Sequence, residues 1–474
     1  AAAGGARAVS NGGASPSSPE NSDPASPAPR PRSWGEMSMV YLESVGQRMT
    51  AGVQAIKEVG NHVIYSLAEL DPLSETNLPP QVHMMGITYE VAPAGSLHRS
   101  SMGASSLGAS AAGSRSVLAS SAASPAILCE GTRLFRQDMR SLLWFTYRQG
   151  FEPIADRGIT CDSGWGCMLR SAQMLFAQAL MVHSLGREWR LPDLEYGQMP
   201  TPYRKILEMF ADHPSAPMSL HRIAAAGEEV GKKAGQWLGP NTVCSAIQRL
   251  HSRGAFGKDC TLQMLLFDTS DGDNTIYRSE CKAKLQAGPL LILLPVRLGT
   301  YTIDRSYVPK VAAIFQLTQS LGFIGGRPNS AHYFVASRGN LVYFLDPHTT
   351  QPYVPLPKDG AEPPPDRHRT WHCQVQRRMN LRDIDASLTF GFYCGDEDDL
   401  DALCEGISAI NAAQGGYAAV SVAESRTHYD SQNGWDQDDD DDDGFDDEVE
   451  DEDEDDKEGG APPPAAPPPR APPK

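Results

Sequence analysis

The residues around Cys167 favour a reactive thiol. This cysteine follows Gly164-Trp165-Gly166, a tripeptide too flexible to be helical, and apolar residues recur at helical spacing after it. The pattern predicts a helix that begins at Cys167. At such a position the unpaired backbone N–H groups and the helix dipole lower the pKa of a thiol, and the glycines let a substrate backbone come close. A purely structural cysteine is the alternative.

A thiolate nucleophile requires a general base, and the base requires a group that orients it. Among the 12 histidines, His348 has the best context, because it follows an apolar strand in the sequence Asp346-Pro347-His348. In an extended chain alternate residues point to the same side, and Pro347 favours that conformation. Asp346 and His348 are therefore expected to face one surface. The spacing leaves open whether they bond each other directly or flank a shared site.

Other interpretations of the histidines stay open. His332 begins the partner strand and either competes with His348 for the role of base or is a hydrogen-bonded structural histidine. The Asp-Pro-His sequence alone also fits a surface turn. A zinc site is not expected, because five residues separate Cys161 from Cys167 and no second ligand pair has metal-ligand spacing. We therefore expect no metal and no other cofactor.

The elements that must hold these residues indicate an α+β protein. Helical periodicity predicts helices over 135–145, 167–185, 203–211, 242–253 and 400–412. Short apolar runs predict strands over 84–91, 263–267, 290–295, 333–337 and 341–345. Helices first and antiparallel strands later are typical of the α+β class.

Composition divides the chain into four parts. Residues 1–35 are small, polar and proline-rich, and 426–474 are acidic and then proline-rich, so both are predicted to be disordered. The segment 36–80 has apolar residues at helical spacing and predicts an amphipathic helical extension. The catalytic candidates lie in the dense region 81–425, which a Ser/Ala-rich insertion at 96–125 interrupts.

The formal net charge of −18 is concentrated in the tail. Residues 436–458 hold 18 acids and one lysine, which leaves the rest of the chain nearly neutral. Nucleic-acid binding through a basic surface therefore has no support. We expect the acidic run to be a solvated, extended segment; a docking site for a basic partner is the alternative.

The nine cysteines are spread thinly, with no C-x-x-C pair. The sequence shows no signal peptide at its start and no apolar run long enough to cross a membrane. These features favour a reducing, cytoplasmic setting in which most cysteines are thiols.

Several motifs give the chain a specific resemblance. They are DSGWGCMLRSAQM at 162–174, LWFTYR at 143–148, GQWLGPNT at 235–242, GFIGGRPNSAHYF at 322–334, LDPHTTQ at 345–351 and FYC at 392–394. In order and spacing this set resembles the autophagin family, the autophagy cysteine proteases. The resemblance implies a papain-like core that carries a small extra subdomain.

The same resemblance implies roles for four residues. Cys167 would attack the peptide bond after the terminal glycine of a ubiquitin-like autophagy modifier. His348 would form an ion pair with Cys167 and protonate the leaving amine, while Asp346 orients its imidazole. Tyr147 matches the oxyanion-hole tyrosine, which donates a hydrogen bond to the tetrahedral intermediate; without the family match it would be taken for a core aromatic residue.

Substrate selection is implied as well. Trp237 matches a tryptophan that covers the active site, and Arg327, Pro328 and Asn329 match a mobile loop over the cleft. A groove closed on both sides would admit glycine and exclude larger side chains. By analogy the enzyme would also release the modifier from phosphatidylethanolamine, because that amide follows the same glycine, and this would bring it transiently to membranes.

Two alternatives to this function stay open. One is a deubiquitinase-type protease for another ubiquitin-like protein, against which Trp237 and Pro328 argue. The other is a scaffold that binds the modifier without cutting it, which would have no need of the complete catalytic set.

Control by oxidation is a further hypothesis. Cys394 and Cys404 flank the acidic start of a predicted helix and are candidates for reversible oxidation that switches the enzyme off. The alternative is that both are ordinary thiols. The acids beside Cys394 should raise its pKa and slow its reaction.

Overall fold

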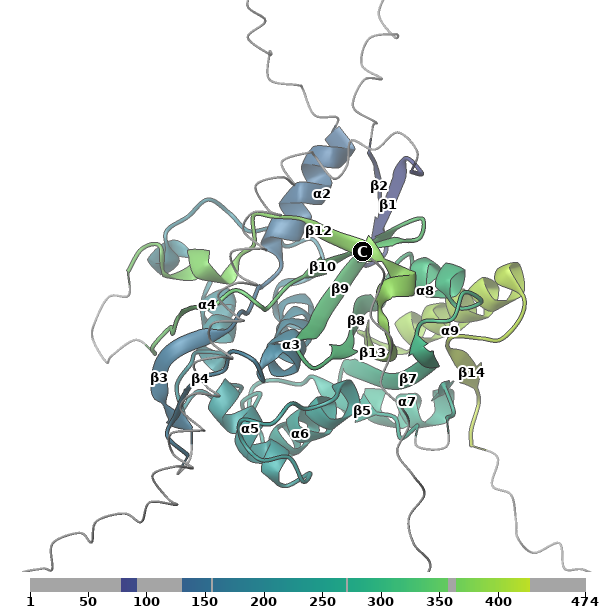
Figure 1. Ribbon diagram of the computed structural model, residues 1–474. Coiled ribbons are helices and arrows are strands. Elements are labelled where there is room, and N and C mark those ends of the chain that lie inside the picture. Colours follow the sequence, from purple (N-terminus) through teal and green to yellow (C-terminus); the bar gives the residue numbers. More distant parts are fainter. Residues whose placement is uncertain (1–77, 92–129, 155–156, 270–271, 357–363, 427–474) are drawn as a thin grey trace, which may run out of the picture. The chain divides into compact units, whose positions relative to one another are not determined.

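The computed structural model describes residues 78–91, 130–154, 157–269, 272–356 and 364–426, all within one compact unit that ends at Arg426 (Figure 1). The predicted segments 1–35 and 96–125, nearly all of 36–80 and the tail from 427 onward lie outside the described residues. The domain boundaries given above therefore stay predictions.

A mixed β-sheet forms the centre of this unit. Its strands are, in spatial order, β12 (Arg377–Asn380), β10 (Leu341–Leu345), β9 (Ser330–Arg338), β8 (Ser320–Arg327), β13 (Asp385–Cys394), β7 (Leu290–Thr302) and β5 (Gln263–Leu266). Neighbours in this order run antiparallel, except that β5 and β7 are parallel. A hairpin of β1 (Gln81–Met84) and β2 (Ile87–Glu90) joins the sheet at β9.

Alternating side chains of the sheet contribute to two hydrophobic cores. Along β7, the adjacent residues Leu291 and Ile292 belong to different cores. The first core contains α3 (Cys167–Leu185), which packs on β8 and β9. The second contains α8 (Val308–Ile314) and α9 (Glu397–Gln414), which lie on the other side of the central strands (Figure 1). The sheet therefore separates α3 from α8 and α9.

The remaining described elements surround this sheet. The helices are α2 (Glu130–Ser141), α4 (Thr201–Met209), α5 (Leu220–Glu228), α6 (Pro240–Ser252) and α7 (Arg278–Leu285). The strands are β3 (Arg148–Ile154), β4 (Ile159–Cys161), β6 (Thr275–Tyr277), β11 (Gln351–Pro352) and β14 (Ser421–Ala423). β3 pairs with both β4 and β11, and β6 pairs with β14. Because β11 follows His348 and β3 follows Tyr147, the pairing of these strands brings two catalytic candidates together.

The α+β class is confirmed, and two elements have the predicted bounds. α3 begins at Cys167 and ends at Leu185, and β10 spans Leu341–Leu345. The single strand predicted over 84–91 is wrong. Met85 and Gly86 have positive φ angles of 49° and 87° and form a tight turn, so this segment is the hairpin of β1 and β2.

The sequence-based prediction missed β8 and β13, two central strands. Both contain glycine, which is depleted in strands, and their positions in the sheet depend on pairing with each other and with β7 and β9. The helix predicted over 135–145 is displaced, because α2 begins at Glu130 and ends at Ser141.

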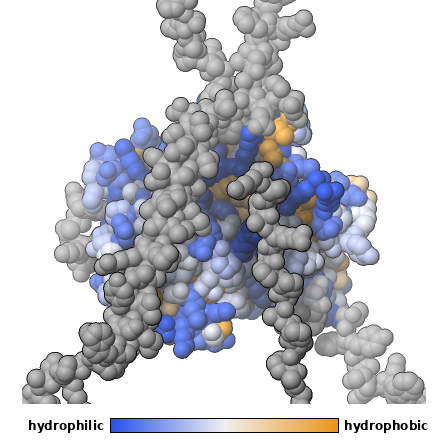
Figure 2. All heavy atoms as spheres, viewed as in Figure 1, coloured by the Kyte–Doolittle hydropathy of each residue, from blue (hydrophilic) through white to orange (hydrophobic). Residues whose placement is uncertain are grey.

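The visible face of the described residues is mainly hydrophilic, and its hydrophobic groups form small separate patches (Figure 2). Tyr301 and Tyr417 are the most exposed large hydrophobic side chains in the described ranges, at 83% and 80%. Isolated side chains of this kind are normal on protein surfaces. Within those ranges no helix combines the length and the apolar character that a membrane span requires.

Candidate active site

Cys167 is the first residue of α3, as the sequence predicted. The N-cap is Gly166, which has no side chain to satisfy the N–H groups of the first turn. Gly164, with a φ of 87°, adopts a conformation that favours glycine. The Cys167 side chain itself is fully buried. The thiol therefore lies against the positive end of a helix and within the protein.

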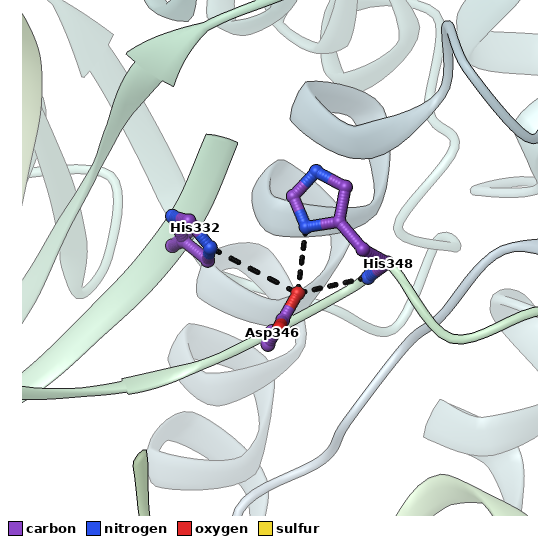
Figure 3. A group of neighbouring side chains, drawn as sticks. All are labelled: His332, Asp346 and His348. Atoms are coloured by element: carbon purple, nitrogen blue, oxygen red, sulfur yellow. Dashed lines mark hydrogen bonds and ion pairs between the residues drawn. The ribbon is translucent and has the colours of Figure 1, made fainter. Parts of the chain in front are cut away.

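Asp346 and His348 bond each other directly. Asp346 Oδ1 lies 2.6 Å from His348 Nδ1 and accepts a hydrogen bond from the backbone N–H of His348 at 2.9 Å. Figure 3 shows both contacts, with the His348 ring turned so that its second nitrogen points away from the carboxylate. The carboxylate thus selects one orientation of the imidazole and leaves Nε2 for other partners.

The Asp346 carboxylate has two further neighbours. Its Oδ2 forms an ion pair with Arg377 of β12. His332 Nε2 lies 3.8 Å from Oδ1, and its ring neighbours the His348 ring at a centroid distance of 5.2 Å (Figure 3). The backbone carbonyl of Asp346 also accepts a hydrogen bond from the Trp144 indole at 2.7 Å. These contacts fix Asp346 on several sides.

His332, Asp346 and His348 have ligand-type atoms within 4.8 Å of one another. These side chains are better suited to orienting the His348 imidazole than to binding a cation, because a metal ion would have to displace the Arg377 guanidinium from Asp346. Burial, together with the charges of His348 and Arg377, holds the pKa of His332 well below its ordinary value. His332 is therefore a neutral neighbour of the carboxylate at neutral pH.

The pKa of Cys167 is lowered although the thiol is buried. Burial is the largest single influence and raises this pKa. Hydrogen bonding and the charge of His348, a hydrogen bond from Tyr147 and one from the backbone of Ala331 together outweigh it. The surroundings of Cys167 therefore favour the thiolate, which is the nucleophilic form.

The Tyr147 side chain is fully buried, and its ring meets the His348 ring edge-on at a centroid distance of 5.5 Å. Burial, followed by the proximity of Cys167, raises the pKa of Tyr147 far above its ordinary value, so the hydroxyl keeps its proton. Within the described part of the chain, neither Tyr147 Oη nor His348 Nε2 has a nitrogen or oxygen partner. Their shared neighbour is the sulfur of Cys167, where both can donate a hydrogen bond.

Backbone pairing brings these side chains to one place. The N–H of Tyr147 donates to the carbonyl of Pro347 at 2.9 Å, and the N–H of Gln351 donates to the carbonyl of Tyr147 at 2.9 Å. The hydroxyls of Ser163 and Thr350 lie 2.8 Å apart and connect the loop before Cys167 to the loop after His348. The segments of Cys167, Tyr147 and His348 are thus tied to one another by hydrogen bonds.

The turn that contains Arg327, Pro328 and Asn329 joins β8 to β9 and is exposed. Asn329 has a positive φ of 61°, a conformation that asparagine tolerates better than most residues. Two residues further on, the backbone of Ala331 is close enough to the sulfur of Cys167 to help lower the pKa of the thiol. The structure therefore brings this turn close to the nucleophile, although the turn has no catalytic group of its own.

Trp237 lies in the segment before α6 and is half-buried against the core that contains Cys167. Its indole N–H is buried without a hydrogen-bond partner among the described residues. No hydrogen bond or ring contact within those residues joins Trp237 to Cys167 or His348. The role of Trp237 as a cover of the active site stays a prediction.

Cys394 and Cys404 lie apart from these groups, in the second core. Burial, followed by the charge of Asp399, raises the pKa of Cys394 well above its ordinary value. Burial also raises the pKa of Cys404, to about 11. The two thiols, together with Cys281, influence one another electrostatically. Their redox role stays a prediction.

Sequence reasoning missed the contacts that Arg377 and Ala331 make with this group. Arg377 reaches Asp346 only because β12 pairs with β10 in the folded sheet, and no local pattern marks it. Ala331 acts through its backbone, so its residue type carries no signal. Asp162, in contrast, stands within the motif around Cys167 and could have been noticed as an acid in an apolar, glycine-rich context.

The chain is similar in sequence to known cysteine proteases. Residues 132–406 match the peptidase C54 catalytic domain. The cysteine protease ATG4B of Gallus gallus is 34% identical over 337 residues, which cover 62% of this chain and 81% of that protein. The cysteine protease ATG4A of Homo sapiens is 37% identical over 293 residues, covering 56% of this chain and 72% of that protein.

A plant relative shows the same relationship. The cysteine protease ATG4b of Arabidopsis thaliana is 35% identical over 314 residues, or 62% of this chain. The match spans 65% of that protein, slightly less than two thirds of its length. These matches confirm the resemblance to the autophagy cysteine proteases and the papain-like α+β class. With a catalytic-domain match over more than half of its length, the chain belongs to the peptidase C54 family of cysteine proteases.

Proposed function

We propose that this chain is a cysteine protease that cleaves after the C-terminal glycine of a ubiquitin-like autophagy modifier and also releases the modifier from phosphatidylethanolamine. One observation carries the proposal: the pKa of the Cys167 thiol, at the start of α3, is lowered by His348, whose other ring nitrogen is bonded to Asp346 at 2.6 Å. This is the arrangement that an activated nucleophile with an oriented base requires.

The proposed reaction begins with attack of the Cys167 thiolate on the carbonyl carbon after which the chain is cut. The carbonyl oxygen becomes an oxyanion, to which the protonated Tyr147 hydroxyl donates a hydrogen bond. His348 transfers its Nε2 proton to the leaving amine, and a thioester remains on Cys167. His348 then removes a proton from water, which attacks the thioester, releases the glycine carboxylate and restores the thiol. Asp346 keeps the imidazole oriented in both steps.

Selection for glycine is proposed to come from Trp237 and the exposed turn of Arg327, Pro328 and Asn329. The position of that turn, two residues from Ala331, supports this role, because the backbone of Ala331 lies near the nucleophilic sulfur and helps lower its pKa. A narrow approach to the sulfur favours a residue without a side chain. The same approach accommodates an amine that belongs either to a peptide or to phosphatidylethanolamine.

The modifier, in its precursor and lipid-conjugated forms, is the proposed partner. The proposed setting is the cytoplasm, with transient contact to membranes through the lipid-conjugated substrate. Each step of the proposed reaction uses only side chains of the chain and water, so no cofactor is invoked. Nucleic acid has no part in the proposal, because the chain outside the acidic tail is nearly neutral.

The test is a cleavage assay with purified chain. A modifier precursor with residues beyond its glycine, and the same modifier conjugated to phosphatidylethanolamine in vesicles, are incubated with the wild type and with Cys167→Ser. We expect the wild type to release both products and Cys167→Ser to release neither while still binding the modifier, because serine lacks thiolate character at neutral pH. Normal turnover by Cys167→Ser would contradict the assignment.

The same assay separates the alternatives. A deubiquitinase-type protease would cut an equivalent ubiquitin fusion at a comparable kcat/KM, and a scaffold would bind the precursor without cutting it. A wild type that processes the precursor but leaves the lipid conjugate intact would restrict the function to processing.

A further inference from the structure

Asp162 is fully buried and links the segments of two catalytic candidates. Its Oδ1 accepts a hydrogen bond at 2.6 Å from the backbone N–H of Arg148, the residue directly after Tyr147. Its backbone carbonyl accepts one at 2.8 Å from the N–H of Gly166, the residue directly before Cys167. A single residue therefore bonds the immediate neighbours of both Tyr147 and Cys167.

A buried arginine completes the link from the side of α3. Arg170, one turn after Cys167, donates from Nε to Asp162 Oδ2 at 2.8 Å and from Nη1 to Asp212 Oδ1 at 2.8 Å. The side chains of Asp162, Arg170 and Asp212 are at most 2% exposed, and so is that of Arg148. Two acids and two arginines balance in charge, which is the condition under which ionised groups can be buried together.

The Asp162 carboxylate lies directly against the backbone of Gly166. A Cβ atom on Gly166 would lie 2.4 Å from Asp162 Oδ2, so only glycine allows the carboxylate to lie this close to the start of α3. Charge-assisted hydrogen bonds of this kind are short and directional. Displacing a reacting group by about 1 Å can cost a hundredfold in rate, so a shift of Tyr147 or Cys167 after loss of these contacts would be measurable in kcat.

We propose that Asp162 is a positioning residue of the active site, which holds the Tyr147 hydroxyl at the Cys167 sulfur by tying the start of β3 to the start of α3. The inference rests on the proposed function. Asp162 touches no reacting atom and acts through Tyr147 and Cys167. A role in general fold stability is the alternative, and Asp212 provides the comparison because it bonds the same arginine.

Two charge-balanced double variants form the matched pair. D162A/R170M removes the hydrogen bond from the Arg148 N–H to the Asp162 carboxylate and leaves only the longer backbone bond of 3.3 Å from the Asp162 N–H to the Arg148 carbonyl. D212A/R170M keeps both bonds and instead removes the hydrogen bond at 2.9 Å from the N–H of Val354 to Asp212 Oδ2. Each variant loses the same arginine, one acid and one hydrogen bond from a backbone N–H. D212A/R170M also loses the buried ion pair of 4.0 Å between Arg148 Nε and Asp212 Oδ2, so its melting temperature should fall at least as far as that of D162A/R170M.

Their activities should differ. We expect kcat for precursor cleavage to fall about a hundredfold in D162A/R170M with little change in KM, and by no more than about fivefold in D212A/R170M. An equal fall in both would mean that Asp162 only stabilises the fold and would overturn the proposal. In D162N/R170M the asparagine oxygen can still accept from the Arg148 N–H, so this variant should recover part of kcat.

A double-mutant cycle measures the coupling directly. Tyr147→Phe should lower kcat about a hundredfold in the wild type, as the loss of an oxyanion donor does, but no more than about threefold in D162A/R170M, where the hydroxyl is already misplaced. The full hundredfold cost in both backgrounds would overturn the proposal. If D162A/R170M does not fold, D162L/R170M takes its place under the same criterion, because leucine fills the space of the aspartate but cannot accept a hydrogen bond from the Arg148 N–H.

A readout without substrate separates this inference from the proposed function. The pH midpoint of Cys167 alkylation by iodoacetamide should rise on Tyr147→Phe in the wild type, because a hydrogen bond that lowers the thiol pKa is lost. In the D162A/R170M background, adding Tyr147→Phe should not raise this midpoint further. If the chain did not cleave the modifier, the proposed function would fail while this measurement still tested Asp162; an equal rise in both backgrounds would overturn the positioning role.

Discussion

Asp346 Oδ1 lies 2.6 Å from His348 Nδ1, although only Pro347 separates the two residues in the sequence. The same oxygen accepts the backbone N–H of His348 at 2.9 Å, so one atom fixes both the ring and the main chain. The orientation of the imidazole is therefore set within three residues, and the rest of the fold needs only to place this unit beside Cys167.

The first prediction separates the two histidines beside Asp346. His348→Ala should lower kcat at least about a thousandfold, because it removes the group that activates the thiol. His332→Ala should retain most of kcat, since His332 is neutral and lies 3.8 Å from the carboxylate. Steady-state cleavage of the precursor measures both. Loss of activity only in His332→Ala would show that the base is misassigned.

The second prediction concerns the pH dependence of Cys167 alkylation. The lowered pKa means that the thiolate persists to lower pH than in an ordinary cysteine, so the midpoint in the wild type should lie below that of free cysteine. In His348→Ala burial remains while its main opposing influence is lost, so the midpoint should move upward. Mass spectrometry of iodoacetamide-treated protein gives both midpoints.

A buried cysteine serves as the control for this measurement. Burial raises the pKa of Cys244 to about 12, so Cys244 should stay unmodified across the same pH range in the folded protein. Equal rates at Cys167 and Cys244 would indicate that the protein had unfolded. An unchanged Cys167 midpoint in folded His348→Ala would contradict the ion pair.

The third prediction tests the approach to the nucleophile. Trp237→Ala should widen the groove, so that a modifier with alanine in place of the terminal glycine gains in relative rate. In a tight pocket one additional methyl group changes kcat/KM by about tenfold or more. Trp237→Ala should lose most of this preference for glycine over alanine. The ratio of kcat/KM for the two modifiers measures this effect, and an unchanged ratio would show that Trp237 only packs against the core.

The fourth prediction concerns oxidation. We expect a mild oxidant to inactivate the enzyme reversibly, with activity restored by a dithiol. The raised pKa values of Cys394 and Cys404 make both thiols slower to react than Cys167, so Cys394→Ser or Cys404→Ser should shift only part of the response. Activity is titrated against redox potential in the three proteins. Superimposable curves would leave Cys167 as the only oxidation site that matters.

The sequence by itself determined the features that depend on neighbouring residues. Gly164 to Gly166 exclude a helix before Cys167, and the apolar spacing after it requires one, so the position of the nucleophile was predictable. The apolar run of β10 followed by Asp346-Pro347-His348 likewise marked a strand with two polar groups at its end. Local conformational preference and hydrophobic periodicity suffice for features of this kind.

Only the tertiary structure decided which distant groups meet. Tyr147 reaches His348 because β3 pairs with β11, and Arg377 reaches Asp346 because β12 pairs with β10. The hairpin of β8 and β9 brings the backbone of Ala331 to Cys167. The order of strands in a sheet depends on burying two cores at once, which no short stretch of sequence encodes. Strand pairing therefore decided which groups surround Cys167, whereas the position of Cys167 at the start of a helix was predictable from the adjacent sequence.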